Sequence, residues 1–152
     1  MFAITEIAMP YRSIRAIIEH QELVSAPGSM TVREAARLMK ERRVGAVIIV
    51  EDGKLAGIFT ERDVVFGVVA EDRDARTTRL ADVMTRDPQT IHPDKPFPDA
   101  LHIMHERGLR HVPVVEDGRP VGMISARDAL GPELEDFIYE LLRREQATDI
   151  LA

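Results

Sequence analysis

The 152-residue chain contains no cysteine, and aromatic residues make up only 5% of it. The missing thiols exclude disulfide bonds, thiolate catalysis and cysteine-ligated metal sites. The longest strongly apolar run lies near residues 44–50, far shorter than the roughly 20 residues that cross a bilayer as a helix. The N-terminus has no basic segment, and Glu6 interrupts its apolar stretch, so it does not resemble a signal peptide. We therefore expect a cytoplasmic protein that does not contact a membrane.

The chain also lacks the positive charge balance that is typical of nucleic-acid-binding proteins, because its formal net charge is −6. It contains no glycine-rich phosphate loop and no recognisable catalytic triad. His102 and His105 share a predicted helix, but spacing identifies no third ligand, so we expect no metal site. With no candidate nucleophile or base, we predict a protein that is not an enzyme, requires no cofactor and binds no nucleic acid.

What the sequence does contain is one block that occurs twice. Residues 30–65 and 95–130 align without a gap at an offset of 65, and 12 of the 36 aligned positions are identical. Such a duplication predicts two similar half-domains of about 60 residues, each marginal alone, that bury their apolar faces against each other. A ligand site is then expected at their junction, or repeated across it.

Each block predicts a strand, a helix, two strands and a second helix, which makes the fold class α/β (α+β). In the first block, Thr31 and Glu34 form a capping box ahead of a helix that ends near Gly45. The apolar runs 46–50 and 55–59 flank an Asp-Gly pair, the strongest short hairpin signal. The second block predicts the matching elements: a helix over 97–107 and strands over 110–115 and 120–124. Upstream of the blocks, segments 14–18 and 80–84 also resemble each other.

We therefore predict a first repeat over 10–70, a charged linker over 71–79, a second repeat over 80–131, and a C-terminal amphipathic helix with a tail over 132–152. The apolar residues of this last helix lie at i, i+3, i+4, i+7 and i+8, which is a single stripe: Leu134, Phe137, Ile138, Leu141 and Leu142. The stripe must cover either its own module or another subunit, and the sequence favours neither.

Residues 57–63 and 122–128 resemble the closing signature of the CBS domain family: glycine, two apolar residues, serine or threonine, two variable residues and aspartate. Residues 82–94 resemble the opening of such a domain, and 110–115 resemble its second strand. The resemblance covers about residues 12–130 and implies a tandem pair, or Bateman module, in which two βαββα repeats pack through their sheets with pseudo-two-fold symmetry. It also implies an adenosyl ligand of the AMP, ADP, ATP, NAD or S-adenosylmethionine class in clefts between the repeats, a homodimer, and regulation of a partner protein that the sequence does not identify.

The Ser/Thr and Asp of each signature stand where a strand runs into a helix: Thr60 with Asp63, and Ser125 with Asp128. A carboxylate there can accept both hydroxyls of a ribose, and the neighbouring hydroxyl and amides can bind a phosphate. The same residues are also adequate helix N-caps. Both roles can coexist, because capping uses only part of a carboxylate's acceptor capacity.

Arg110 and His111 begin a strand of the second repeat where the first repeat has Gly45 and Ala46. In nucleotide-binding members of the family, a basic residue here often reaches the phosphates, and arginine can bind phosphate bidentately. We therefore expect an asymmetric module. Its better-equipped cleft is predicted to hold Arg110, His111, Met123, Ser125, Arg127 and Asp128. Apolar residues from the other repeat's strands are expected to form the wall against which the base of the ligand lies. The cleft of the first repeat should take a less charged ligand or stay empty, and its predicted residues are Ile58, Thr60, Arg62 and Asp63.

The leading hypothesis is thus a stand-alone regulatory module that binds an adenine nucleotide. The alternative is a structural module that dimerises through its C-terminal helix and has non-functional clefts. A small enzyme is a third and weaker possibility.

Overall fold

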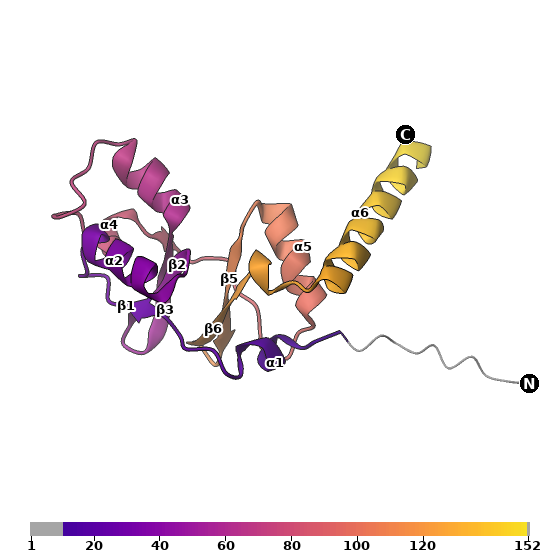
Figure 1. Ribbon diagram of the computed structural model, residues 1–152, viewed down its shortest axis with the longest axis horizontal. Helices are drawn as coiled ribbons and strands as arrows, with labels where there is room; N and C mark the ends of the chain where they lie inside the picture. The colour runs from indigo at the N-terminus through magenta and orange to yellow at the C-terminus, as the bar shows by residue number, and fades with distance from the viewer. Residues whose placement is uncertain (1–10, 152) are drawn as a thin grey trace, which may run out of the picture.

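The computed structural model describes residues 11–151 and contains two α/β lobes in tandem (Figure 1). The predictions for the N-terminal stretch around Glu6, for the start of the first repeat at residue 10 and for the final residue of the tail lie outside the described residues. The first lobe contains a four-stranded sheet of order β1-β2-β3-β4. Its strands are β1 (Ser25–Ala26), β2 (Ala46–Glu51), β3 (Lys54–Thr60) and β4 (Thr85–Arg86). β1 runs parallel to β2, and the other neighbours are antiparallel.

The second lobe contains the antiparallel pair β5 (His111–Glu116) and β6 (Arg119–Ser125). An isolated parallel bridge between Ile91 and Val114 stands where β1 pairs with β2 in the first lobe. The helices α2 (Val32–Arg42) and α5 (Phe97–Arg107) occupy matching places in the two repeats. The mixed α/β fold of two repeats and a C-terminal helix is therefore confirmed.

Local chemistry explains why these elements form where the sequence predicts them. The capping box of Thr31 and Glu34 is present at the start of α2. In the β2–β3 hairpin, Asp52 and Gly53 have φ values of 52° and 74°, and the corresponding pair in the β5–β6 hairpin has φ values of 53° and 77°. Positive φ at both central positions is the type I′ geometry that matches the twist of paired strands.

The two lobes exchange a short helix. α1 (Ile14–Ile18) stands at the start of the first repeat but packs on the second lobe, where Ile14 and Ile18 share a core with Phe97. α4 (Leu80–Val83) packs in the same way on the first lobe, where Leu80 shares a core with Phe59. In Figure 1, α1 accordingly lies beside β6. Each core is thus completed by the other half of the chain.

Matching backbone hydrogen bonds hold the exchanged helices. The amide of Leu80 donates to the carbonyl of Met30 at 2.9 Å, and the amide of Ile14 donates to the carbonyl of Lys95 at 3.1 Å. Met30 and Lys95 are equivalent positions at the repeat offset of 65. The exchange is therefore reciprocal and follows the pseudo-two-fold symmetry.

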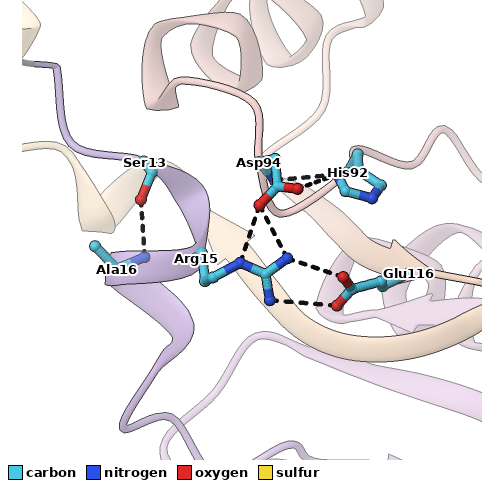
Figure 2. A network of polar contacts seen from close by, with 6 residues as sticks. All are labelled: Ser13, Arg15, Ala16, His92, Asp94 and Glu116. Atoms are coloured by element: carbon cyan, nitrogen blue, oxygen red, sulfur yellow. Dashed lines mark hydrogen bonds and ion pairs between the residues drawn. The ribbon is translucent and has the colours of Figure 1, made fainter.

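A polar network fixes α1 to the second lobe (Figure 2). The Arg15 guanidinium lies 2.9 Å from carboxylate oxygens of both Asp94 and Glu116. Arg15 lowers the pKa of the Glu116 carboxyl, mainly through this hydrogen bond. The hydroxyl of Ser13 accepts from the amide of Ala16 at 3.2 Å and caps the helix.

The two repeats differ after their closing signatures. In the first repeat, α3 (Glu61–Asp63) continues into the π-helix η1 (Val64–Val69). In the second repeat, only the 3₁₀ turn η2 (Ala126–Asp128) forms, and Ala129 is extended with ψ 127°. The chain then turns into α6 (Gly131–Leu151), which begins beside α5 and whose C-terminal end points away from both lobes (Figure 1).

The apolar stripe of α6 is divided between two environments. Phe137 packs against α5 with its ring centroid 5.1 Å from that of His102 and 5.9 Å from that of His105. Leu134, Ile138 and Leu142 remain 44–53% exposed. The predicted stripe therefore covers its own module through Phe137, while the row beside it stays open to solvent.

Candidate functional site

Two clefts lie between the repeats, and each takes residues from both. The Asp63 cleft has a volume of about 710 Å³, which is within the usual range for small-molecule sites. The first repeat and its following helix supply Ile58, Thr60, Glu61, Arg62, Asp63, Val65 and Phe66. The second half of the chain supplies Thr85, Pro88, Gln89, Arg107, Gly108, Leu109, Arg110 and His111.

The Ser125 cleft, of about 680 Å³, is lined by Arg43, Val44, Gly45, Glu61, Arg110, His111, Ser125, Ala126 and Arg127. At the offset of 65, residues 43–45 correspond to 108–110, and 125–127 correspond to 60–62. The two clefts are therefore related by the pseudo-symmetry of the repeats. Glu61, Arg110 and His111 line both clefts, so the clefts have three side chains in common.

The signature corner of the Asp63 cleft is a complete capping box. Thr60 Oγ1 accepts from the Asp63 amide at 3.2 Å, and Asp63 Oδ2 accepts from the Thr60 amide at 2.9 Å and from its hydroxyl at 3.1 Å. The capping prediction is thus confirmed here. Both bonds that the Asp63 carboxylate accepts end on Oδ2, and Asp63 Oδ1 has no hydrogen-bond partner among residues 11–151. One carboxylate oxygen therefore remains available to accept from a ligand.

The second corner repeats this arrangement, since Asp128 Oδ2 accepts from the amide of Ser125 at 2.7 Å and from its hydroxyl at 3.3 Å. Behind the corner, Arg12 Nη2 donates to the Asp128 carbonyl at 2.7 Å and also pairs with Glu133 of α6. Arg12 thereby joins the N-terminal segment, the second signature and the start of α6.

The structure brings together most of the predicted site residues but separates two of them. Arg110, His111, Ser125 and Arg127 share the Ser125 cleft, and the four residues predicted for the first repeat share the Asp63 cleft. Met123 and Asp128 line neither cleft. The Gln21 side chain, which follows α1, bonds to both the amide and the carbonyl of Met123 at 2.8 Å. The Gln21 side chain therefore occupies the backbone polar groups of Met123, a residue that was predicted for the ligand cleft.

The prediction that the first repeat's cleft takes a less charged ligand rested on a shortage of cationic groups there, and the lining of the Asp63 cleft shows no such shortage. Arg62, Arg107 and Arg110 line it, which is the same number of arginines as in the Ser125 cleft. The reason is that the start of β5 in the second repeat faces the signature corner of the first. Alignment of one repeat on the other shows which residues are equivalent, but it does not show which repeat completes which cleft.

His111 contributes little positive charge near neutral pH. Burial, which disfavours the imidazolium ion, is the largest cause of its lowered pKa, and the charges of Arg127 and Arg110 act in the same direction. Glu61 opposes the shift. The cation common to both clefts is therefore Arg110.

Sequence reasoning missed Arg43, Arg107, Val65 and Phe66 as lining residues. Arg43 and Gly108 are equivalent C-caps in the left-handed conformation, with φ values of 55° and 65°. The end of each first helix therefore lines a cleft, and the duplication could have indicated this. Nothing in the sequence indicated that Val65 and Phe66 face the cleft, because apolar residues on a predicted helix normally indicate burial.

Within residues 11–151, no three His, Asp or Glu side chains come together in a way that could hold a metal ion. No helix in the same part of the chain is long and apolar enough to cross a bilayer.

Comparison with known proteins identifies the fold. The model of the CBS domain matches this chain twice, over residues 14–70 and 80–132. The mitochondrial CBS domain-containing protein CBSX3 of Arabidopsis thaliana is 32% identical over 118 residues, which span 74% of this chain and 57% of that protein. The CBS domain-containing protein YhcV of Bacillus subtilis is 32% identical over 107 residues, spanning 70% of this chain and 76% of its own length.

Two similar solved structures contain adenosyl compounds. The CBS domain protein PAE2072 from Pyrobaculum aerophilum, complexed with AMP, is 26% identical with a TM-score of 0.71, covering 81% of this chain and 98% of that one. The CBS domain pair of protein MJ0100, in complex with 5′-methylthioadenosine and S-adenosyl-L-methionine, is 27% identical with a TM-score of 0.70. The match covers 78% of this chain and 93% of that one. CBS domains are regulatory modules that catalyse no reaction. With both of its repeats matched, this chain belongs to the CBS domain family.

Proposed function

We propose that this CBS pair is a sensor that binds an adenosine nucleotide in the Asp63 cleft and reports its occupancy to a partner protein. The observation that carries the proposal is the composition of that cleft. It combines a carboxylate oxygen without a partner in the described structure, three arginines and an apolar wall, drawn from both repeats.

Each part of the cleft matches one part of a nucleotide. Asp63 Oδ1 is free to accept from ribose hydroxyls, while Oδ2 keeps the corner capped. Arg107 and Arg110 provide guanidinium groups for phosphate, which arginine can bind in bidentate fashion. Ile58 and Val65 supply apolar surface for a base. The AMP and S-adenosyl-L-methionine complexes of similar CBS proteins support this class of ligand.

Signalling follows from the construction of the clefts. Because each cleft takes residues from both repeats, a ligand that prefers one arrangement of the repeats shifts the population toward it. Arg12 connects the second signature to α6, so this helix is placed to transmit the shift. We further propose that the module acts as a homodimer and that a partner protein binds the shifted form.

The test is calorimetric titration of the purified protein with AMP, ATP, NAD and S-adenosylmethionine. The decisive variant is Asp63→Asn, which keeps one acceptor oxygen for the cap but loses the second. We expect it to weaken the best ligand at least tenfold, about 1.4 kcal/mol, without lowering the melting temperature. Asp128→Asn is the matched variant in the second corner and reports whether Asp128 also binds a ligand. Failure of all four compounds to bind the wild-type protein at millimolar concentration would reject the proposal.

The exposed row on α6 favours a second candidate function, a structural module that assembles through this helix. Leu134, Ile138 and Leu142 are each nearly half exposed or more. This alternative predicts that Ile138→Asp changes the mass measured by light scattering and that no nucleotide binds. A wild-type monomer, or an assembly that Ile138→Asp leaves intact, would rule it out.

A further inference from the structure

We infer that Phe66 is the aromatic surface on which the base of the ligand stacks in the Asp63 cleft. This inference rests on the proposed function and deepens it, because it assigns base recognition to one residue and one cleft. The first observation is exposure. Phe66 is 61% exposed, whereas Phe59 and Phe97 are fully buried and Phe137 packs against α5. The packing of residues 11–151 does not explain why this ring, which lines the cleft, stays exposed.

The second observation is the position of Phe66 in an unusual helix. It lies in the π-helix η1, where the amide of Ala70 donates to the carbonyl of Val65 at 2.9 Å across five residues. Segments of this kind are rare and frequently occur at functional sites. Phe66 and Val65 line the cleft, and η1 follows directly on Asp63. The same short segment therefore carries the carboxylate proposed for the ribose and the ring proposed for the base.

The third observation is the contact that holds the ring. The guanidinium carbon of Arg62 lies 5.3 Å from the centroid of the Phe66 ring, a cation–π distance. Because this contact restricts the ring before binding, less side-chain freedom is lost when a base packs against it. Arg62 lines the same cleft, so it stands beside both the ring and the proposed ligand.

The fourth observation is asymmetry. At the offset of 65, the residue equivalent to Phe66 is Gly131, where the chain turns into α6. No aromatic residue other than His111 lines the Ser125 cleft, whose lining within the described chain is mostly polar. We therefore assign preference for a planar base to the Asp63 cleft and none to the Ser125 cleft.

The competing explanation is that Phe66 belongs to a contact between copies of the chain. Val65 and Val69 are also exposed, at 54% and 66%, and η1 as a whole is apolar. Val69 distinguishes the two explanations, because it shares the exposed helix but does not line the cleft. Val69→Ala is therefore the matched control for Phe66→Ala.

The experiment measures the affinities of AMP and ribose 5-phosphate, which lacks the base, for the full chain and both variants by calorimetry. We expect Phe66→Ala to weaken AMP binding about tenfold, as for loss of one stacked base, and to leave ribose 5-phosphate binding unchanged. Val69→Ala should change neither affinity. Since the chain has two tyrosines but no tryptophan, Phe66→Trp adds a single tryptophan that can be excited selectively. Its emission should change on AMP binding but not on ribose 5-phosphate binding.

Each other outcome has a definite meaning. If Phe66→Ala binds AMP within twofold of wild type, base stacking on Phe66 is rejected and the proposed function stands. If both alanine variants lower the mass measured by light scattering and neither affects AMP binding, η1 is an interface and the inference is also rejected. If the wild-type protein does not bind AMP, both the inference and AMP as the ligand are rejected.

Discussion

The signature glycines Gly57 and Gly122 are required by packing. A Cβ atom at Gly57 would lie 2.7 Å from the backbone oxygen of Thr85, and one at Gly122 would lie 2.7 Å from the Ile18 side chain. Thr85 follows α4, and Ile18 belongs to α1. Both glycines therefore permit the close approach of the exchanged segments to β3 and β6.

This contact predicts unequal effects of alanine at the two glycines. Gly57→Ala should destabilise the fold by about 2–4 kcal/mol and Gly122→Ala by about 1–2 kcal/mol, since overpacking costs more when the neighbour is backbone. Urea unfolding measures both values. Ile18→Ala removes the Cγ2 and Cδ1 atoms that the new methyl group would meet. It should therefore partly rescue Gly122→Ala in a double-mutant cycle, and it should not rescue Gly57→Ala. Equal effects of the two glycine variants would contradict this explanation.

His111 makes stability depend on pH. Burial lowers its folded-state pKa below the ordinary value of 6.5, so the folded protein holds the neutral ring more strongly than the unfolded chain does. Its contribution to stability is complete above pH 6.5 and is lost as the pH falls toward the folded-state pKa. The groups acting on the ring are Glu61, Asp128, Arg110 and Arg127.

Thermal melts between pH 7.5 and 5 test this dependence. The wild-type melting temperature should fall below pH 6.5, and His111→Gln should remove part of that fall. His20→Gln is the matched control, because the His20 side chain is 92% exposed, and its profile should follow that of the wild type. A His111→Gln profile parallel to wild type would contradict the argument.

At the scale of elements, local signals in the sequence were sufficient where neighbouring residues decide the structure. The Asp-Gly turns and the box of Thr31 and Glu34 form as predicted, because their bonds lie within a few residues. The resemblance of segments 14–18 and 80–84 indicated that they are equivalent, but only tertiary packing shows that they exchange lobes. The places of Arg107 and Arg110 in the Asp63 cleft were missed for the same reason, since both reach it from the other repeat.

The half-buried ring of Phe137 supplies the apolar part of the contact between α6 and the second lobe, beside the ion pair of Arg12 and Glu133. Phe137→Ala should lower the free energy of unfolding by about 1–2 kcal/mol, because it removes apolar contact with the core of the second lobe. Hydrogen exchange in the first half of α6 should become faster as the helix leaves α5. Ile138→Ala, one position further along the helix and 47% exposed, should change neither quantity. Equal effects of the two variants would contradict this explanation, because they would mean that exposed residues such as Ile138 also fix α6, through contact with another subunit.

At the scale of the whole molecule, the exchange of helices makes the two lobes interdependent. The core containing Phe97 and Ile124 requires Ile14 and Ile18, and the core containing Phe59 requires Leu80. A chain divided within the linker at residue 74 therefore gives two fragments that each lack part of a core. We predict that neither fragment melts cooperatively by circular dichroism alone and that mixing them restores a cooperative transition. A cooperative melt of either fragment alone would contradict the interdependence.

The central claim is that a nucleotide binds where the two repeats meet at Asp63. A crystal structure of the protein with AMP tests it most directly. We predict one AMP with its ribose hydroxyls within hydrogen-bond distance of Asp63 Oδ1, its phosphate beside Arg107 or Arg110, and its base against Phe66. AMP located away from Asp63, with the cleft unoccupied by the nucleotide, would contradict the account.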